Sequence, residues 1–512
     1  MDREDVNQGS GTLELIFRHA QERPTAPALK DDDESLTYAQ FLDRVSASAG
    51  VLRSLGVGEG DRVGLFLPNS VAFVVTALAC MWLGASFVPL SVEEAPARLS
   101  HILEDCVPTL VVARVDHHPL LFSPGARKAT RIVDLEHISG QPGQGYDVPQ
   151  GPISDAYVLY TSGTTGQPKG VTVPELAFRF SIASSAEALG LDETTRAMCV
   201  ASFHFDGSYA AVFPTLTMGG SVLIPRREDL LSMRRFFGAV SDEGITHTGV
   251  SPSYLRLLLS SQKLHSLGAS NLKTFTVGGE ECIADDIARL WEVLPRLRVF
   301  NCYGPTEATI EVTTYEISRD DVASGQVPIG FPHPGVDFQI ISESAGLVAR
   351  PYETGELYIG GSQLMRGYWG DPALTNKVLR DDIVLGTTLY KTGDLVWRDD
   401  DGRYFYAGRS DDVVKRNGVR ISLTEVARGL RASAQVSAAI CLLVDHGGRP
   451  GIAAFVEASE QLSEEVLRDA ARSQLPAAML PDEIFVLTSL PMTPSGKIDR
   501  DRLMSEVRRR EL

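Results

Sequence analysis

A run of hydroxyl residues, glycines and one lysine follows a short apolar segment, in Tyr160-Thr-Ser-Gly-Thr-Thr-Gly-Gln-Pro-Lys169-Gly170. Glycines let a backbone turn so that N–H groups converge on an anion, and hydroxyls and a lysine add donors and positive charge. A Walker P-loop is excluded, because Lys169 follows a proline and does not precede Ser or Thr. An ordinary polar turn is the alternative to a polyphosphate site. The residues expected to hold a polyphosphate are Thr161, Ser162, Gly163, Thr164, Thr165, Gly166 and Lys169.

A second motif, Asn301-Cys-Tyr-Gly-Pro-Thr-Glu307, also fits nucleotide chemistry. Its Gly-Pro pair predicts a turn after a strand. Tyr303 can stack on a flat base, and Thr306 can donate to a phosphate. Glu307 offers a hard oxygen ligand of the kind that Mg²⁺ prefers. A surface salt bridge is the alternative for Glu307.

The segments that must position these residues alternate between strand-like and helix-like patterns. Helical patterns cover Tyr38–Leu55 and Met233–Asp242. Strands alternating with helices predict an α/β fold with parallel strands. The apolar stretch Val71–Leu90 is long enough for a bilayer but contains Gly and Pro, so it predicts a buried helix followed by a strand. The expected strands are Arg62–Leu67, Ser86–Leu90, Thr109–Ala113, Tyr157–Tyr160, Ser221–Ile224, Lys273–Val277 and Arg298–Cys302.

The pattern changes near Gly355, where short strands and a tight turn at Asp401-Gly402 indicate antiparallel hairpins. After the polar stretch Ser410–Asp412, the last hundred residues read as a compact α+β unit. We therefore expect a large domain of mixed and parallel sheets, residues 1–410, which includes a small antiparallel barrel-like part. A small C-terminal α+β domain would cover residues 411–512.

Composition excludes several classes of protein. The 512 residues are 43% hydrophobic and 22% charged, as in globular proteins. With 48 basic and 66 acidic residues the net charge is −18, which disfavours nucleic-acid binding. The acidic N-terminus lacks the apolar core of a signal peptide. Six scattered cysteines form no CxxC pair and fit a reducing cytoplasm, and nothing suggests a membrane partner.

With these motifs the chain resembles the adenylate-forming enzymes, which include acyl-CoA synthetases, luciferases and adenylation domains of nonribosomal peptide synthetases. The resemblance covers about residues 12 to 505 and implies ATP and Mg²⁺ as cofactors. Besides the two motifs above, the resemblance rests on five further sequence motifs, which occur in the same order as in the family. These are Gly355-Glu-Leu-Tyr-Ile, Tyr390-Lys-Thr-Gly-Asp394-Leu, Gly408-Arg409-Ser-Asp411, Lys415-Arg-Asn-Gly418-Val-Arg420-Ile and Pro494-Ser-Gly-Lys497-Ile-Asp-Arg500.

The resemblance implies roles in the second half of the chain. Asp394 would accept the ribose hydroxyls, with Arg409 in the same site. Lys497 would contact the acyl carboxylate and the α-phosphate and offset the charge that develops there. Asp411 would be the hinge about which a mobile C-terminal domain rotates. Val413 and Ser422 stand where the family commonly has Gln and Glu, which puts the carrier-facing surface in doubt.

The segment Ser202-Phe-His-Phe205-Asp206-Gly-Ser208 resembles the substrate block of amino-acid adenylation domains. A buried carboxylate is costly unless a cation meets it, so Asp206 favours a substrate with an amine. A helix N-cap is the alternative for Asp206. The matching pocket residues are Phe205, Asp206, Gly207, Ala210, Gly249, Thr276, Gly278, Cys302, Ile310, Glu311 and Lys497.

The small residues of this set predict a roomy pocket that favours a large side chain, and a β-amino acid stays open. Glu311 either faces a distal cation on the substrate or binds a local Arg or water. We therefore expect an enzyme that forms an aminoacyl adenylate and passes the acyl group to a phosphopantetheine thiol. The acceptor would be a discrete carrier protein, and the chain would act as a free-standing enzyme. An acyl-CoA or aryl-CoA synthetase and a degenerate ATP-binding scaffold are the alternatives.

Overall fold

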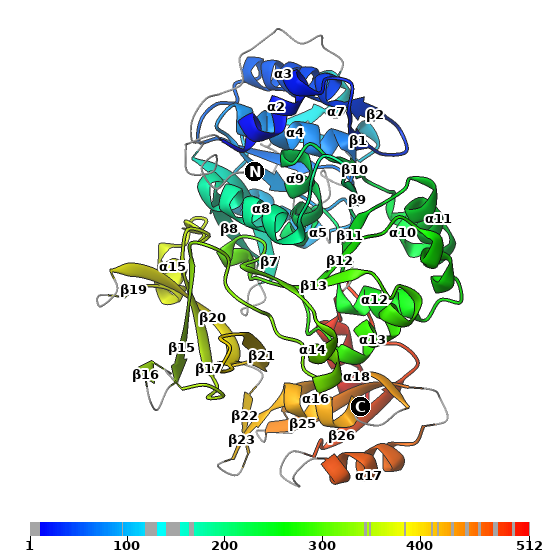
Figure 1. Cartoon of the computed structure of the whole chain (residues 1–512). Coiled ribbons are helices and arrows are strands. Elements are labelled where there is room, and N and C mark those ends of the chain that lie inside the picture. The colour runs from blue at the N-terminus through cyan, green and yellow to red at the C-terminus, as the bar shows by residue number, and fades with distance from the viewer. Residues whose placement is uncertain are drawn as a thin grey trace. The chain divides into compact units, whose positions relative to one another are not determined.

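The computed structural model divides into two compact units (Figure 1). One unit comprises residues 1–338 and 359–390, and the other comprises residues 339–358 and 391–512. The predicted division into residues 1–410 and 411–512 stays a prediction. The structure describes residues 11–94, 96–117, 131–139, 154–162, 168–342, 346–347, 350–382, 386–410, 413–416, 419–431, 435–445, 450–458, 462–474, 480–493 and 497–510.

A seven-stranded sheet in the first unit has the order β18-β8-β7-β4-β3-β5-β6. Its inner strands run parallel, and β8 returns antiparallel against β7. The strands are β3 (Arg62–Phe66), β4 (Ser86–Pro89), β5 (Leu110–Ala113), β6 (Ile132–Asp134), β7 (Asp155–Ser162), β8 (Pro168–Pro174) and β18 (Gly367–Tyr368).

An eight-stranded sheet in the same unit has the order β14-β13-β12-β11-β9-β10-β1-β2. All strands from β13 to β1 pair in parallel, whereas β14 and β2 are antiparallel edges. The strands are β1 (Pro27–Lys30), β2 (Ser35–Thr37), β9 (Arg196–Met198), β10 (Ser221–Leu223), β11 (His247–Val250), β12 (Thr274–Gly278), β13 (Arg298–Tyr303) and β14 (Thr313–Glu316).

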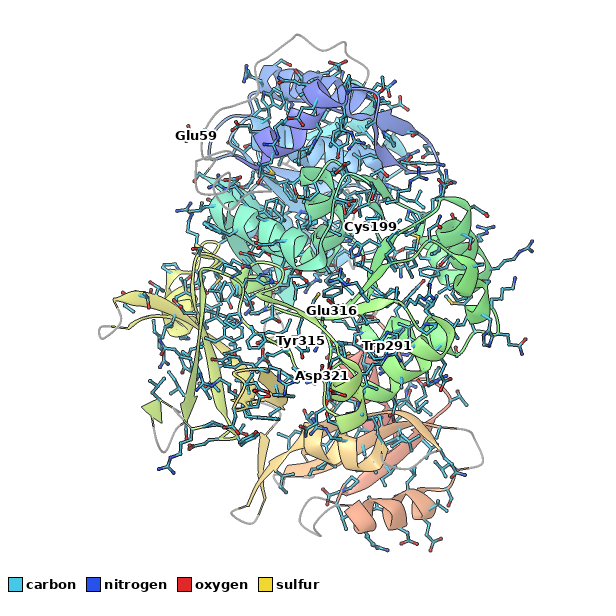
Figure 2. The ribbon with its side chains drawn as sticks, viewed as in Figure 1. Glu59, Cys199, Trp291, Tyr315, Glu316 and Asp321 are labelled. Atoms are coloured by element: carbon cyan, nitrogen blue, oxygen red, sulfur yellow. The ribbon has the colours of Figure 1, made fainter. Side chains whose placement is uncertain are left out.

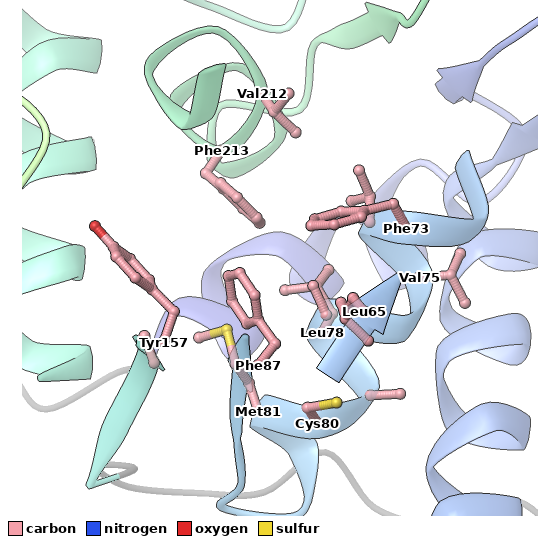
Figure 3. Close-up of a cluster of buried hydrophobic side chains, with 14 of the residues drawn as sticks. Leu65, Phe73, Val75, Leu78, Cys80, Met81, Phe87, Tyr157, Val212 and Phe213 are labelled. Atoms are coloured by element: carbon pink, nitrogen blue, oxygen red, sulfur yellow. The ribbon is translucent and has the colours of Figure 1, made fainter. Parts of the chain in front are cut away.

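Helices pack on these sheets because their apolar side chains need burial. Helix α4 (Val71–Trp82) is apolar on nearly every face and buried, and Ser70 caps it by accepting from the Phe73 N–H. Phe73, Phe87, Tyr157 and Phe213 lie in one buried cluster (Figure 3). Each such side chain contributes about 1.5–3 kcal/mol when fully buried. In the described chain no helix has both the length and the apolar character that crossing a bilayer requires.

The remaining helices of the first unit lie between these strands or beside them in the chain. Thr37 begins α3 with a capping box. They are α2 (Thr12–Glu22), α3 (Tyr38–Ser54), α5 (Pro96–Cys106), α7 (Leu135–Ser139), α8 (Glu175–Leu189), α9 (Tyr209–Thr217), α10 (Arg227–Leu231), α11 (Met233–Asp242), α12 (Pro252–Leu259), α13 (Ala284–Val293), α14 (Arg319–Ser324) and α15 (Pro372–Val378). Short 3₁₀ helices are η1 (Val115–His117), η2 (Asp206–Ser208), η3 (Leu264–Ala269) and η4 (Thr306–Ala308).

A third sheet has the order β16-β15-β17-β20-β19, with β21 on β20. Asp394 pairs with Arg409 in the antiparallel register of β20 and β21. Gly402 adopts a φ of 83° at the turn between them, as the Asp-Gly pair predicted. The strands are β15 (Val336–Ser342), β16 (Gly346–Leu347), β17 (Gly355–Gly361), β19 (Leu379–Asp382), β20 (Thr387–Arg398) and β21 (Tyr404–Arg409).

The C-terminal part of the second unit is the expected α+β assembly. Strands β22 and β23 form a two-stranded ribbon, and β24, β25 and β26 form a three-stranded sheet. Ser463 caps α17 by accepting from the Val466 N–H. The elements are β22 (Val413–Arg416), β23 (Val419–Ser422), α16 (Leu423–Arg431), β24 (Val436–Asp445), β25 (Pro450–Ala458), α17 (Glu464–Gln474), β26 (Glu483–Leu487) and α18 (Arg500–Arg510).

Candidate active site

Several of the expected site residues gather at one edge of the eight-stranded sheet. Strands β9, β11, β12 and β13 are parallel, so their carboxyl ends meet at the same edge (Figure 1). Open parallel sheets bind their ligands at such an edge. Gly249 pairs with Thr276, and Gly278 pairs with Cys302. Segments carrying further candidates follow β9 and β13: Phe205, Asp206, Gly207 and Ala210, and Thr306, Glu307, Ile310 and Glu311.

The glycines at this edge serve different purposes from those expected. A Cβ on Gly249 would lie 2.0 Å from Thr276 Oγ1, and one on Gly278 would lie 2.7 Å from the Cys302 carbonyl oxygen. Glycine is required there for close packing, so these two positions do not enlarge a pocket. A Cβ on Gly207 would meet no atom within 4 Å. Gly207 is exposed, so the space beside it is open, and the roomy pocket stays a prediction.

Asp206 lies in the 3₁₀ turn η2, directly before α9. Ser208 is the residue at the N-cap of α9, and it makes no side-chain capping bond, so Asp206 does not serve as that helix cap. Burial raises the pKa of Tyr157 and of Tyr209, and the charge of nearby Asp206 raises both further. The Tyr157 hydroxyl is buried without a hydrogen-bond partner. The Asp206 carboxylate therefore lies close to two buried phenol groups.

Glu307 forms a buried cluster with Lys169 and Tyr368. Lys169 Nζ lies 3.0 Å from Glu307 Oε1 and 2.6 Å from the Tyr368 hydroxyl, which donates to Glu307 Oε1 at 2.7 Å. Burial alone would raise the pKa of Glu307, but the Lys169 charge and the hydrogen bonds from both partners hold the pKa below its usual value. Glu307 is 7% exposed, so its ion pair with Lys169 is buried and is not the surface salt bridge of the alternative.

The polyphosphate candidates that the structure describes lie in two paired antiparallel strands. Strand β7 continues to Ser162, and Lys169 lies in β8 opposite Thr161. The motif predicted that Lys169 belongs to the loop. In the structure Lys169 is a strand residue, and the pairing of β8 with β7 fixes its position. Gly163, Thr164, Thr165 and Gly166 lie outside the described residues.

ATP and Mg²⁺ fit the residues that are present. Thr161 Oγ1 is buried without a hydrogen-bond partner and could donate to a phosphate oxygen. Within the described ranges, no cluster of three or more His, Cys, Asp or Glu could hold a metal. Mg²⁺ commonly binds one or two carboxylates together with substrate phosphates. Glu307 could therefore hold a magnesium ion that is brought in with the nucleotide.

Glu311 lies beyond the turn that follows β13, in a network of polar side chains. Its Oε1 accepts from Ser185 Oγ at 2.5 Å and from Thr314 Oγ1 at 3.1 Å. Burial raises the pKa of the Cys302 thiol, and the adjoining, hydrogen-bonded Glu311 raises it further. No local arginine pairs with Glu311 among the described residues, and Glu311 accepts its hydrogen bonds from local hydroxyls.

The backbone between Glu307 and Glu311 adopts an unusual conformation. Thr309 and Ile310 have φ values of 62° and 66°, a region that side-chain-bearing residues rarely occupy. Gln363 Nε2 donates to the Glu311 carbonyl at 2.7 Å, and Ser181 Oγ donates to that of Thr309 at 2.9 Å. These contacts hold the strained segment, and with it the direction of both carboxylates.

Two expected nucleotide contacts meet in the second unit. Arg409 Nη1 lies 3.1 Å from Asp394 Oδ1. Lys497 is exposed, and its carbonyl oxygen accepts from the Thr493 N–H at 2.7 Å. The expected hinge, Asp411, lies outside the described residues.

Several residues of this edge were missed by the sequence analysis: Ser181, Ser185, Thr314, His333, Gln363 and Tyr368. No local motif indicates them, because hydroxyls and amides recruited from distant segments carry no spacing signal. Tyr368 reaches Lys169 because β18 pairs with β8, a pairing of segments distant in sequence.

Comparison with known proteins agrees with this geometry. The family model for AMP-binding enzymes matches residues 16–369. Tyrocidine synthase 1 of Brevibacillus parabrevis is 30% identical over 499 residues, which cover 97% of this chain and 45% of that protein. Isonitrile lipopeptide synthase of Streptomyces coeruleorubidus is 33% identical over 509 residues, covering 96% of this chain and 33% of that protein. The chain thus spans less than half the length of these curated relatives.

A solved structure shows the same fold. It is that of AB3403, described as a four domain nonribosomal peptide synthetase bound to AMP and glycine. It is 26% identical, has a TM-score of 0.82, and the match covers 98% of this chain and 38% of that one.

Proposed function

The chain belongs to the family of AMP-binding enzymes, and on that premise we propose that it is an ATP-dependent ligase that activates an amino acid. The substrate carboxylate attacks the α-phosphorus of ATP, an aminoacyl adenylate forms, and pyrophosphate leaves. The acyl group then passes to the phosphopantetheine thiol of a carrier protein, with release of AMP. The curated relatives, which are peptide synthases, support the carrier as partner.

The placement of Asp206 is the observation that carries the choice of an amino acid. The carboxylate stands at the carboxyl edge of the parallel strands, outside the role of helix cap, with open space beside Gly207. A plain carboxylic acid offers such a carboxylate no cation, whereas an α-ammonium group would pair with it. An amine-bearing acid is therefore favoured over the substrate of an acyl-CoA or aryl-CoA synthetase.

Each unit carries residues that would bind the nucleotide. Thr161 and Lys169 would bind phosphate oxygens, and Glu307 would bind the magnesium ion that accompanies them. Tyr303 and Thr306 would contact the base and a phosphate, and Asp394, held by Arg409, would accept the ribose hydroxyls. Lys497 would offset the negative charge that develops during attack. The hinge role of Asp411, the discrete carrier protein and the cytoplasmic setting belong to the same proposal.

Exchange of labelled pyrophosphate into ATP tests the choice between acid classes. A panel of amino acids is compared with their deaminated analogues, which keep the side chain and lose the amine. The proposal expects exchange with an amino acid and at least about 100-fold less with its analogue, because the half-buried Asp206 carboxylate would lose its cation. Exchange driven equally by the deaminated acid would contradict amino-acid activation and support a synthetase for plain acids.

A further inference from the structure

Glu311 differs from the other buried carboxylates in what surrounds it. Four of those carboxylates pair with a cation: Glu307 with Lys169, Asp286 with Arg256, Asp394 with Arg409 and Asp399 with Arg403. Two accept a backbone N–H group: Glu175 from Thr12, and Asp321 from Ser318. In the described part of the chain, Glu311 has neither kind of partner, although it is only 5% exposed.

The groups that do meet the Glu311 carboxylate are neutral. Ser185 and Thr314 donate hydroxyl hydrogens to Oε1, and Cys302 contributes a thiol whose proton is held by burial and by the carboxylate itself. Hydroxyl and thiol donors stabilise a buried carboxylate less than a cation does. The site is thus satisfied in hydrogen bonds and uncompensated in charge.

His333 is a nearby group that could carry a positive charge, and its surroundings keep it neutral. Its Nε2 lies 3.0 Å from Thr314 Oγ1 and its Nδ1 lies 3.1 Å from Gln363 Oε1. Burial lowers the pKa of His333 despite the charge of Glu311, which acts in the opposite direction. At neutral pH the histidine therefore orients Thr314 without neutralising the carboxylate.

The position of Glu311 indicates where a cation would come from. Cys302 lies near the carboxyl end of β13, at the sheet edge where the segments with Asp206 and Glu307 begin. Glu311 contacts the side chain of Cys302. A close approach of the chain at Gly304, where a Cβ would lie 2.4 Å from Glu311 Cα, keeps Glu311 at this edge. A ligand bound along the carboxyl ends of β9 to β13 would therefore pass Asp206 and reach Glu311.

We propose that the amino acid has a cationic side chain, with its α-ammonium group bound by Asp206 and its side-chain cation by Glu311. Arginine, lysine and ornithine belong to this class of basic amino acids. The inference rests on the proposed function, because it names the class of amino acid that the same site activates.

Pairs of substrates matched in shape and different in charge test this inference. Pyrophosphate exchange is measured with arginine against citrulline and with lysine and ornithine against norleucine and norvaline. We expect kcat/KM for one basic amino acid to exceed that of its neutral partner by at least about 100-fold, since Glu311 would lose its only cation. A neutral or aromatic amino acid as the best substrate would overturn the inference and leave amino-acid activation intact.

The variant Glu311→Gln separates the carboxylate from the shape of the site. Gln keeps an oxygen that can accept from Ser185, so we expect the preference for the basic substrate to fall by about 100-fold while the neutral partner is used as well or better. The matched control is Glu316→Gln, which makes the same chemical change at an exposed residue of β14 (Figure 2). Glu316 pairs with Arg298 of β13, and its variant should keep the wild-type preference.

The two proposals fail in different ways. If Glu311→Gln does not fold, the wild-type substrate pairs decide the question alone. An unchanged preference in a folded Glu311→Gln variant would overturn the role of Glu311. Exchange with plain acids and with no amino acid would overturn both this inference and the proposed function.

Discussion

Lys169 Nζ lies 3.0 Å from Glu307 Oε1. Lys169 is expected to bind the phosphates and Glu307 to bind Mg²⁺, and in the described structure these two side chains form an ion pair with each other. Tyr368 holds both, because its hydroxyl contacts the ammonium group and donates to the carboxylate. This arrangement keeps a cation and an anion together beside the carboxyl end of β13. It also keeps Glu307 ionised in spite of its burial.

Tyr368→Phe tests this arrangement. The substitution removes the hydroxyl and keeps the ring, whose centroid lies 4.3 Å from Lys169 Nζ. Hydrogen bonds to charged groups contribute about 1.5–3 kcal/mol, so kcat/KM for ATP should fall by at least about 10-fold. Tyr352→Phe, which removes an exposed hydroxyl that bonds to Asp400, serves as the control and should change kcat/KM by less than about twofold.

Glu307 should make stability depend on pH in the acidic range. Its pKa in the folded protein lies below the ordinary value of 4.5, so its contribution is complete above that value and is lost as pH falls through the folded pKa. Urea unfolding of the wild type and of Glu307→Gln should therefore differ at pH 7, and the difference should shrink as pH falls from 4.5 through the lower folded pKa. A constant difference at every pH would contradict an ionised, paired Glu307.

His247 should contribute a second pH dependence at higher pH. It lies buried in β11, with Nδ1 2.9 Å from Thr274 Oγ1, and burial lowers its pKa from 6.5 to about 4. The unfolded chain binds the proton more readily, so stability should fall by up to about 3 kcal/mol as pH drops from 6.5 to 4. Unfolding of His247→Gln over this window should show a smaller fall; an equal fall would place the effect elsewhere.

Two glycine substitutions should separate folding from substrate space. In Gly304→Ala the new Cβ would lie 2.4 Å from Glu311 Cα and 2.6 Å from the Ile310 carbonyl oxygen. Backbone would have to move, so we expect a loss of at least about 1–3 kcal/mol in thermal unfolding. In Gly207→Ala the Cβ meets nothing within 4 Å, so the variant should unfold like the wild type and lose affinity for the amino acid.

Asp206→Asn should affect the amino acid and spare the nucleotide. The substitution removes the charge that would pair with the α-ammonium group, and kcat/KM for the amino acid should fall by about 100-fold or more. Binding of ATP, measured by calorimetry, should stay within about twofold of the wild type. Unchanged activation of the amino acid would show that Asp206 does not bind its amine.

Local patterns were sufficient for much of the fold. Met233–Asp242 is a helix with the predicted ends, and Arg62–Leu67 and Arg298–Cys302 form strands whose bounds differ by one residue. The strands β9, β11 and β8 were missed because they are short or contain glycine and proline. Their place depends on pairing with strands distant in sequence, which no local period indicates.

The candidate site, like the fold, was predictable where contiguous motifs define it and not where distant segments meet. Contiguous motifs predicted Lys169, Asp206 and Glu307, whose residue types suit the chemistry. The contacts that give them their electrostatic setting come from other segments, as with Tyr368 for Glu307 and Ser185 for Glu311. The small residues at Gly249 and Gly278 predicted space, but Thr276 and Cys302 fill it, because residue size alone does not say which neighbour lies alongside.

The nucleotide products formed with an amino acid give the most direct test of adenylation. The protein is incubated with ATP, Mg²⁺ and the amino acid that supports exchange, and the products are separated and identified by mass. Adenylation predicts pyrophosphate and an enzyme-bound aminoacyl adenylate, both dependent on the amino acid and both lost in Lys497→Ala. Formation of ADP and phosphate, or of AMP without any aminoacyl adenylate, would contradict it.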